Sequence, residues 1–200
     1  ENGVVSKILP RKNQILRPPA ANIDRAVLVV SSDKPQPNTL ILDKLIAVCE
    51  SKGIEPLLVF TKTDLADSSD LQEVYRRAGF RVFTSCPGQS DYSGLLTEMA
   101  GRLSVFIGNS GVGKSTLMNA LIPELEVATA QISDKLGRGR HTTRHVELYE
   151  LEGGGLVADT PGFSTVEIEK YGHIPKEELP ECFREFREYL GRCQFQNCSH

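Results

Sequence analysis

The residues with the clearest chemistry form a glycine-rich loop at positions 108–115. The loop fits the pattern G-x-x-x-x-G-K-[ST], and it stands between an apolar run ending at Ile107 and a helix-like run beginning at Lys114. Glycines at these places let backbone N–H groups turn toward phosphate oxygens, and a helix N-terminus adds partial positive charge. The loop predicts a nucleotide phosphate site made of Gly108, Asn109, Ser110, Gly111, Val112, Gly113, Lys114, Ser115 and Thr116.

Two further features predict a magnesium-dependent phosphate site with switches. We expect Lys114 to bridge the β- and γ-phosphates as a catalytic group and the Ser115 hydroxyl to ligate Mg²⁺. The tetrapeptide Asp159-Thr160-Pro161-Gly162 follows an apolar strand-like run. An acid there can hold Mg²⁺ through a water, and the Gly162 N–H can contact the γ-phosphate. Asp159 and Gly162 are therefore expected to form a second switch.

A polar, glycine-rich loop at 133–143 separates these two motifs. A first switch needs a threonine that ligates Mg²⁺ and senses the γ-phosphate, and either Thr142 or Thr143 is available. Many GTPases place a water-orienting glutamine directly after the second switch motif, but Phe163 stands there. Because a phenyl ring cannot orient water, another polar group must do so, or intrinsic hydrolysis must be slow.

A second motif selects the base. Residues 61–64 fit the guanine-reading pattern [N/T]-K-x-D and follow the apolar run 56–60. The Asp64 carboxylate can accept hydrogen bonds from guanine N1–H and N2–H₂, which adenine lacks, while the lysine stem covers the ring. Thr61 replaces the commoner asparagine, and its side chain can still bridge to the phosphate loop. The predicted GTP site thus includes Thr61, Lys62, Thr63 and Asp64, with Ser85 and Cys86 offering backbone N–H groups to guanine O6.

Alternating apolar runs and helical periods must position these loops. We expect strands at 26–30, 56–60, 80–84, 103–107, 145–151 and 155–159, and helices at 39–51, 69–78 (with Ser69 as its cap), 92–102 and 114–121. This pattern predicts an α/β fold with a mostly parallel sheet covered by helices. A short strand is expected within 4–12, before a proline-marked linker, and a small helical segment at 175–190.

The order of the motifs is unusual, because the guanine-reading residues precede the phosphate loop. Ordinary GTPases have the reverse order, and a circular permutation explains the change, since termini can move to another surface loop without altering the sheet. In this order both switches come directly before the C-terminal segment. The sequence therefore predicts that nucleotide state is passed directly to that segment.

Composition narrows the class of protein. The chain of 200 residues is 40% apolar, with a formal net charge of −3 and a pI of about 5.9, which does not favour a chain dominated by nucleic-acid backbone binding. It has no apolar run long enough for a membrane span and no signal-like N-terminus, so we expect no membrane partner. Five cysteines, an odd number, favour a reducing compartment and metal ligation over a disulfide framework.

Over nearly its whole length the chain resembles the circularly permuted GTPases that depend on the small ribosomal subunit, the bacterial ribosome-biogenesis factor A type. The likeness includes Ile8-Leu9-Pro10-Arg11-Lys12-Asn13, residues 17–24, the loop 108–116, Gly139-Arg140-His141-Thr142-Thr143 and Asp159-Thr160-Pro161-Gly162-Phe163. The tail Cys193-Gln194-Phe195-Gln196-Asn197-Cys198-Ser199-His200 matches the family pattern C-x4-C-x-H and separates it from other permuted GTPases.

The resemblance implies three parts: an OB-fold remnant and linker at 1–24, a permuted GTPase domain at 25–169, and the start of a zinc-binding domain at 170–200. It implies Zn²⁺ held by Cys193, Cys198 and His200, with the family's fourth ligand outside this sequence; water or Cys182 could replace it. It also makes His141 the catalytic candidate.

For partners, the resemblance implies GTP and GDP, the maturing small ribosomal subunit and its rRNA, with the protein acting as a monomer in the cytoplasm or in an organelle stroma or matrix. Three alternatives remain open at this point. They are a permuted GTPase of large-subunit assembly, a nucleotide-sensing RNA-binding adaptor with negligible turnover, and an ATP-using P-loop kinase.

Overall fold

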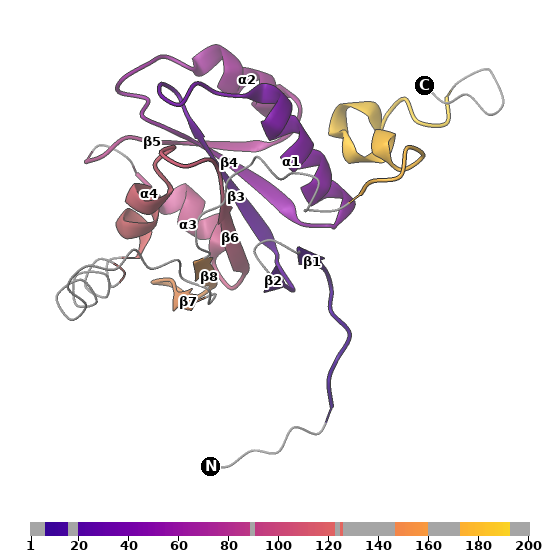
Figure 1. Cartoon of the computed structure of the whole chain (residues 1–200), viewed down its shortest axis with the longest axis horizontal. Coiled ribbons are helices and arrows are strands. Elements are labelled where there is room, and N and C mark those ends of the chain that lie inside the picture. The colour runs from indigo at the N-terminus through magenta and orange to yellow at the C-terminus, as the bar shows by residue number, and fades with distance from the viewer. Residues whose placement is uncertain are drawn as a thin grey trace.

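A computed structural model describes residues 7–15, 20–88, 91–122, 125, 147–159 and 173–192. Its centre is a six-stranded sheet in the order β5-β4-β3-β6-β8-β7 (Figure 1). Five strands are parallel and β7 runs antiparallel to β8 at the edge, so the predicted mostly parallel sheet is confirmed. The strands are β3 (Arg25–Ser31), β4 (Glu55–Thr61), β5 (Arg81–Ser85), β6 (Leu103–Ile107), β7 (Glu147–Glu150) and β8 (Leu156–Asp159).

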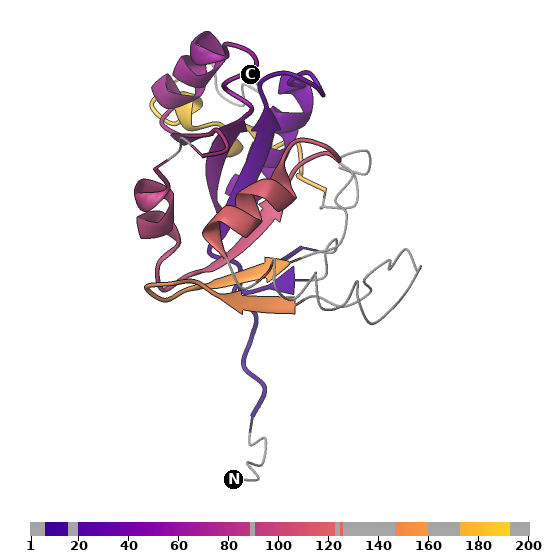
Figure 2. The ribbon, with the colours of Figure 1, turned by 90° about the vertical axis from the view of Figure 1, so that its left-hand side faces the viewer.

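Helices cover both faces of the sheet (Figures 1 and 2). They are α1 (Thr39–Ser51), α2 (Ser69–Arg77), α3 (Ser93–Met99) and α4 (Lys114–Leu121). Side chains alternate along each strand, so Leu28 and Val30 of β3 join the core under α1 and α2, whereas Val27 and Val29 join the core under α3 and α4. Burial on both faces explains why the central strands are apolar at every position.

The helix ends follow local chemistry, with two departures from the sequence-based expectation. Asn38 caps α1, since its Oδ1 accepts a hydrogen bond from the Ile41 N–H at 3.1 Å. Ser69 was expected to cap α2 but is its first residue, and the Asp67 carboxylate accepts from its N–H at 2.9 Å instead. Helix α3 ends at Met99, earlier than expected, because Ala100 is extended (ψ 130°).

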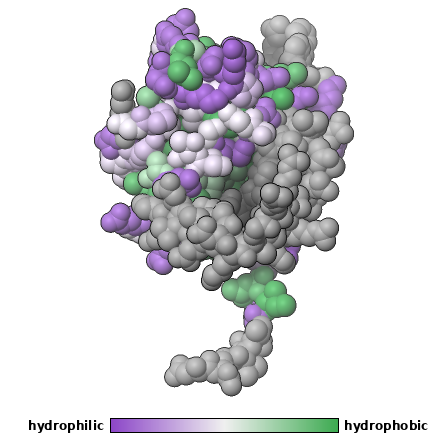
Figure 3. Space-filling model, turned by 60° about the vertical axis from the view of Figure 1, so that its left-hand side comes forward, coloured by the Kyte–Doolittle hydropathy of each residue, from purple (hydrophilic) through white to green (hydrophobic). Residues whose placement is uncertain are grey.

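The N-terminal strand lies later than predicted. No strand forms among residues 7–12, and β1 (Gln14–Ile15) pairs instead with β2 (Ala20–Ala21) in a separate two-stranded sheet. The Asn13 side chain fixes this turn, because it accepts from the Ile23 N–H and donates to the Ile23 carbonyl, both at 2.8 Å. The segment before it extends away from the body and carries an apolar patch (Figures 1 and 3).

The C-terminal segment 173–192 forms short 3₁₀ turns where a longer helix was expected. They are η2 (Leu179–Cys182) and η3 (Arg184–Phe186). Pro180 lacks an N–H, and Phe183 is extended (φ −112°, ψ 113°), so helical hydrogen bonding is interrupted between the two turns. In the described part of the chain, no helix is long and apolar enough to cross a membrane.

Candidate nucleotide-binding site

The motif residues gather at the carboxyl edge of the sheet. In the strand register Ser31 lies beside Thr61, and Thr61 beside Ser85, so the ends of β3, β4 and β5 are level. The phosphate loop follows β6, the neighbour of β3 on its other side. Strand order reverses between β3 and β6, and the crevice outside such a reversal is where open α/β sheets bind ligands.

The phosphate loop joins β6 to α4 and depends on its glycines. A Cβ on Gly108 would lie 2.5 Å from the Val29 carbonyl oxygen, so only glycine fits against β3. Gly111 (φ +77°) and Gly113 (φ +99°) adopt left-handed conformations that turn the backbone around the loop. Ser115 and Thr116 are exposed in the first turn of α4.

The Lys114 ammonium lies inside this loop. It donates to the Gly108 carbonyl at 2.6 Å and to the Asn109 carbonyl at 2.7 Å. Its side chain is half-buried, and this burial lowers the pKa of the ammonium below its ordinary value. A partly desolvated cation surrounded by loop backbone is well placed to bind phosphate oxygens.

The guanine-reading segment is tied directly to the phosphate loop. The buried Thr61 hydroxyl lies 2.5 Å from the Val112 carbonyl oxygen and 3.2 Å from that of Val30. This is the bridge that the sequence predicted for the threonine in place of asparagine. Lys62 Nζ donates to the Gly111 carbonyl at 2.8 Å and also to the Lys34 carbonyl. The two motifs therefore form one unit, although the phosphate loop comes much later in the chain.

Lys62 adopts a left-handed backbone conformation (φ +57°), which is costly for a residue with a side chain. The conformation turns the chain so that Lys62 reaches the phosphate loop while Asp64 stays exposed at the edge. A strained backbone conformation persists where the surrounding contacts hold it in place. Here two carbonyl oxygens accept hydrogen bonds from the Lys62 ammonium and hold the residue.

Asp64 and Cys86 meet from neighbouring strand ends. Desolvation and hydrogen bonding with Asp64 raise the pKa of the Cys86 thiol, which keeps it protonated beside the carboxylate. The Ser85 hydroxyl lies 2.9 Å from the Tyr92 hydroxyl, which fixes the end of β5. Thr63 is half-buried. The structure thus brings together both segments that were expected to read guanine.

Two residues that contact the site were not predicted from the sequence motifs. Lys34 supplies a carbonyl oxygen and Tyr92 a hydroxyl, and neither belongs to a nucleotide motif. The only signal for Lys34 was its position directly after a buried strand at the same edge of the sheet. A main-chain carbonyl has no residue-type signature, so sequence patterns do not identify it.

The remaining predicted residues are placed only in part. Asp159 ends β8, opposite Glu147 of β7. His141, Thr142, Thr143, Gly162, Cys193, Cys198 and His200 lie outside the described residues. Cys182 is buried, and its thiol donates to the Glu178 carbonyl at 3.5 Å. Among the described residues, no group of three or more His, Cys, Asp or Glu side chains is arranged to hold a metal.

A phosphate loop after β6, joined to guanine-reading residues that come earlier in the chain, defines a circularly permuted P-loop GTPase. Residues 8–169 match the RsgA GTPase family, and the chain belongs to that family.

Relatives agree with this assignment. The chain is 44% identical to the small ribosomal subunit biogenesis GTPase RsgA of Caldanaerobacter subterraneus subsp. tengcongensis, over 100% of the chain and 68% of the relative. It is 45% identical to the protein of that name from Geobacillus kaustophilus, over 99% of the chain and 69% of the relative. Among solved structures, it matches YloQ, described as a circularly permuted GTPase, with a TM-score of 0.73 and 36% identity, over 97% of the chain and 62% of YloQ. It matches YjeQ of Thermotoga maritima with a TM-score of 0.72 and 32% identity, over 98% and 66%.

Proposed function

We propose that the chain carries a guanine-specific GTP hydrolysis site, and that the small ribosomal subunit stimulates it during late subunit maturation. The observation that carries this proposal is the joint formed by Thr61 and Lys62 with the carbonyls of Val112 and Gly111. This joint fixes the distance between a base reader and a phosphate loop. Because the two parts of the site are already held together, little conformational entropy of the protein is lost when a guanine nucleotide binds.

In this proposal each residue of the site has a distinct task. Lys114 exchanges its two loop carbonyls for β- and γ-phosphate oxygens, and backbone N–H groups of the loop 108–116 surround the phosphates. Asp64 accepts the N1–H and N2–H₂ groups of guanine, and backbone N–H groups near Ser85 and Cys86 contact its O6. The Lys62 stem lies along the ring face while its ammonium stays on the phosphate loop.

The donor set fits Mg²⁺. Ser115 presents an exposed hydroxyl in the first turn of α4, and Asp159 is an acid at the end of β8. These are oxygen donors, which Mg²⁺ prefers, and we assign Ser115, Asp159 and one of Thr142 and Thr143 to it. When bound, Mg²⁺ neutralises charge that develops on the β- and γ-phosphates.

The hydrolysis step is assigned to a water that attacks the γ-phosphate in line. Phe163 cannot orient this water, so we assign that role to His141 and expect slow intrinsic turnover. A slow GTPase suits a timer, in which GTP orders the switches, the ordered form binds its partner, and hydrolysis releases it. An adaptor with negligible turnover is the competing reading, and Phe163 is the feature that favours it.

The partner follows from the relatives, whose name states that they act in biogenesis of the small ribosomal subunit. We propose the maturing small subunit and its rRNA as partners of a monomeric protein in the cytoplasm, or in an organelle stroma or matrix. The separate β1–β2 sheet supports assigning 1–24 to an OB-fold remnant and linker, with the GTPase domain at 25–169. Residues 170–200 are assigned to the start of a zinc domain, in which Cys193, Cys198 and His200 have the sulfur and nitrogen donors that Zn²⁺ prefers.

The test is GTP hydrolysis by the full chain with and without isolated small subunits, with large subunits as the matched control. Stimulation by small subunits alone supports the proposal. Stimulation by large subunits alone would assign the protein to assembly of the large subunit. No turnover in either mixture would favour the nucleotide-sensing adaptor. In parallel, GDP and ADP affinities measured by titration should differ by at least about a hundredfold, because adenine lacks the paired N1–H and N2–H₂ donors that Asp64 would accept.

A further inference from the structure

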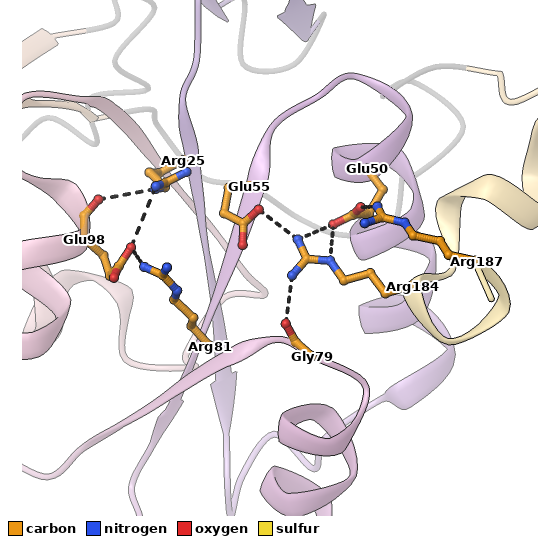
Figure 4. A network of polar contacts seen from close by, with 8 residues as sticks. All are labelled: Arg25, Glu50, Glu55, Gly79, Arg81, Glu98, Arg184 and Arg187. Carbon is orange, nitrogen blue, oxygen red and sulfur yellow. Dashed lines mark hydrogen bonds and ion pairs between the residues drawn. The ribbon is translucent and has the colours of Figure 1, made fainter.

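Arg184 makes several of the polar contacts that attach the C-terminal segment to the GTPase domain. Arg184 of η3 donates from Nε to Glu50 at 2.8 Å and from Nη2 to Glu55 at 2.8 Å (Figure 4). Its Nη1 donates to the Gly79 carbonyl at 2.8 Å, and its guanidinium lies 4.5 Å from the centre of the Phe80 ring. One side chain therefore contacts the end of α1, the start of β4 and the turn after α2.

This arginine is withdrawn from solvent together with its partner. The side chains of Arg184 and Glu50 are 16% and 7% exposed, and Arg187 adds a second ion pair to Glu50 at 2.6 Å. Burial by itself lowers the pKa of the Arg184 guanidinium, but hydrogen bonds with Glu50 and Glu55 outweigh it and raise the pKa. Removing Arg184 would leave the largely buried Glu50 carboxylate with fewer positive partners. Loss of such a partner lowers the free energy of unfolding far more than loss of a surface ion pair.

The attachment lies at the edge of the sheet opposite the nucleotide site. Glu50 is in the last turn of α1, Glu55 begins β4, and Gly79 follows α2, so all three belong to the amino edge. The nucleotide loops follow the carboxyl ends of the same strands. The 13 residues of α1 separate the two edges by about 20 Å.

From these contacts we infer that Arg184 is a positioning residue that clamps the C-terminal segment to the amino edge of the GTPase domain, independently of the bound nucleotide. Among the described residues, none of the partners of Arg184 belongs to the phosphate loop or to the guanine-reading segment, so these loops give a nucleotide no direct contact through which to loosen the clamp. The C-terminal region then moves with the GTPase domain as one body.

Cys182 gives a direct readout, because it is buried under the clamp in η2, whereas Cys49 is buried in the core side of α1. The experiment is pulse alkylation of the full chain with N-ethylmaleimide at fixed pH, with mass spectrometry resolving each cysteine. We expect Cys182 of the wild type to react at the same slow rate, within about twofold, without nucleotide, with GDP and with a non-hydrolysable GTP analogue. In Arg184→Ala we expect its rate to rise by about tenfold or more while Cys49 stays slow.

Arg25→Ala is the matched control, because Arg25 is equally buried (13% exposed) and faces Glu98 at the same edge without touching the C-terminal segment (Figure 4). It should leave Cys182 slow. Arg184→Lys keeps the charge but cannot reach all three partners, so it should give an intermediate rate even if the alanine variant does not fold.

Three results would overturn the clamp: a slow Cys182 in both Arg184 variants, a parallel rise at Cys49, or a clear change in Cys182 labelling on addition of nucleotide. GDP binding is measured on the same sample by fluorescence. Failure of GDP to bind would therefore count against the proposed function, while the comparison of Arg184 and Arg25 variants would still decide the clamp.

Discussion

The Thr61 hydroxyl and the Val112 carbonyl oxygen lie 2.5 Å apart, and this contact joins the guanine-reading segment to the phosphate loop. Thr61 is 4% exposed, so water cannot replace the bond. The neighbouring Lys62 makes a second connection to Gly111. The relative position of base and phosphate sites is therefore set by two adjacent side chains at the end of β4.

Removing the Thr61 hydroxyl should weaken nucleotide binding. Thr61→Val keeps the shape of the side chain but leaves the Val112 carbonyl unpaired, which costs about 1–2 kcal/mol. If the native loop conformation is needed for binding, GDP affinity should fall by about tenfold, as measured by titration of a fluorescent GDP analogue. Thr61→Ser retains the hydroxyl and should bind within about threefold of the wild type. Equal affinity in the valine variant would show that the bridge does not shape the site.

Asp64 should control the choice of base and leave phosphate binding intact. Asp64→Asn removes an acceptor for the N1–H and N2–H₂ groups, so GDP affinity should fall by about a hundredfold or more, while weak ADP affinity stays unchanged. Asp70→Asn is the control, because it makes the same charge change at an exposed position in the first turn of α2. A parallel loss of GDP and ADP binding in Asp64→Asn would mean that the residue supports the loop and does not read guanine.

Motifs and periodicity predicted the central sheet and the bridge from Thr61 to the phosphate loop, for identifiable reasons. The run Ala26 to Val30 is apolar at every position because β3 is buried on both faces. A short run of this kind is typical of a central strand in a parallel sheet. The loop 108–115 requires glycine at Gly108, because a Cβ there would overlap the Val29 carbonyl. The residue types of the loop therefore reveal its backbone conformation. The bridge from Thr61 was predictable because the guanine-reading pattern itself implies a phosphate loop nearby.

Other parts depend on contacts between distant residues and were not predictable. The carbonyl of Lys34 serves the site through its backbone alone. The segment 173–192 shows helical spacing, but Pro180 and the extended Phe183 divide it, and its Arg184 contacts Glu50, which lies far away in the chain. The expected coupling between the switches and the C-terminal segment stays a prediction, because residues 126–146 and 160–172 lie outside the described part of the chain.

Gly155 in the β7–β8 turn should be required for stability but not for nucleotide binding. A Cβ at Gly155 would lie 2.5 Å from the Met99 carbonyl oxygen, whereas one at Gly153 meets nothing within 4 Å. Both residues have positive φ values (+108° and +92°), so the alanine variants share the backbone cost, about 1 kcal/mol, and differ in the clash. Denaturant unfolding should show Gly155→Ala to be less stable than Gly153→Ala by about 2 kcal/mol. Equal stabilities would mean that β8 shifts freely against α3.

Asp24 should make the stability of the fold depend on acid pH. Its carboxylate accepts from Lys12 Nζ at 2.7 Å and from the Leu103 N–H at 2.9 Å, which joins the linker to β6. Burial alone raises the pKa of this carboxyl, but the hydrogen bonds from Lys12 and Leu103 and the nearby cations outweigh it and lower the pKa below 3.8.

Because the folded-state pKa lies below the unfolded one, the stabilisation from Asp24 is fully present above the unfolded pKa and is lost as pH falls through the folded pKa. The free energy of unfolding, measured in urea from about pH 6 down to about pH 3, should therefore decline less steeply in Asp24→Asn than in the wild type. The variant should also be less stable at neutral pH by about 1 kcal/mol, since the amide cannot form the ion pair with Lys12. Asp70→Asn, whose carboxylate is exposed, serves as the control and should keep the wild-type slope. Parallel acid slopes for Asp24→Asn and the wild type would show that other carboxylates dominate and that the Lys12–Asp24–Leu103 connection adds no acid-sensitive stability.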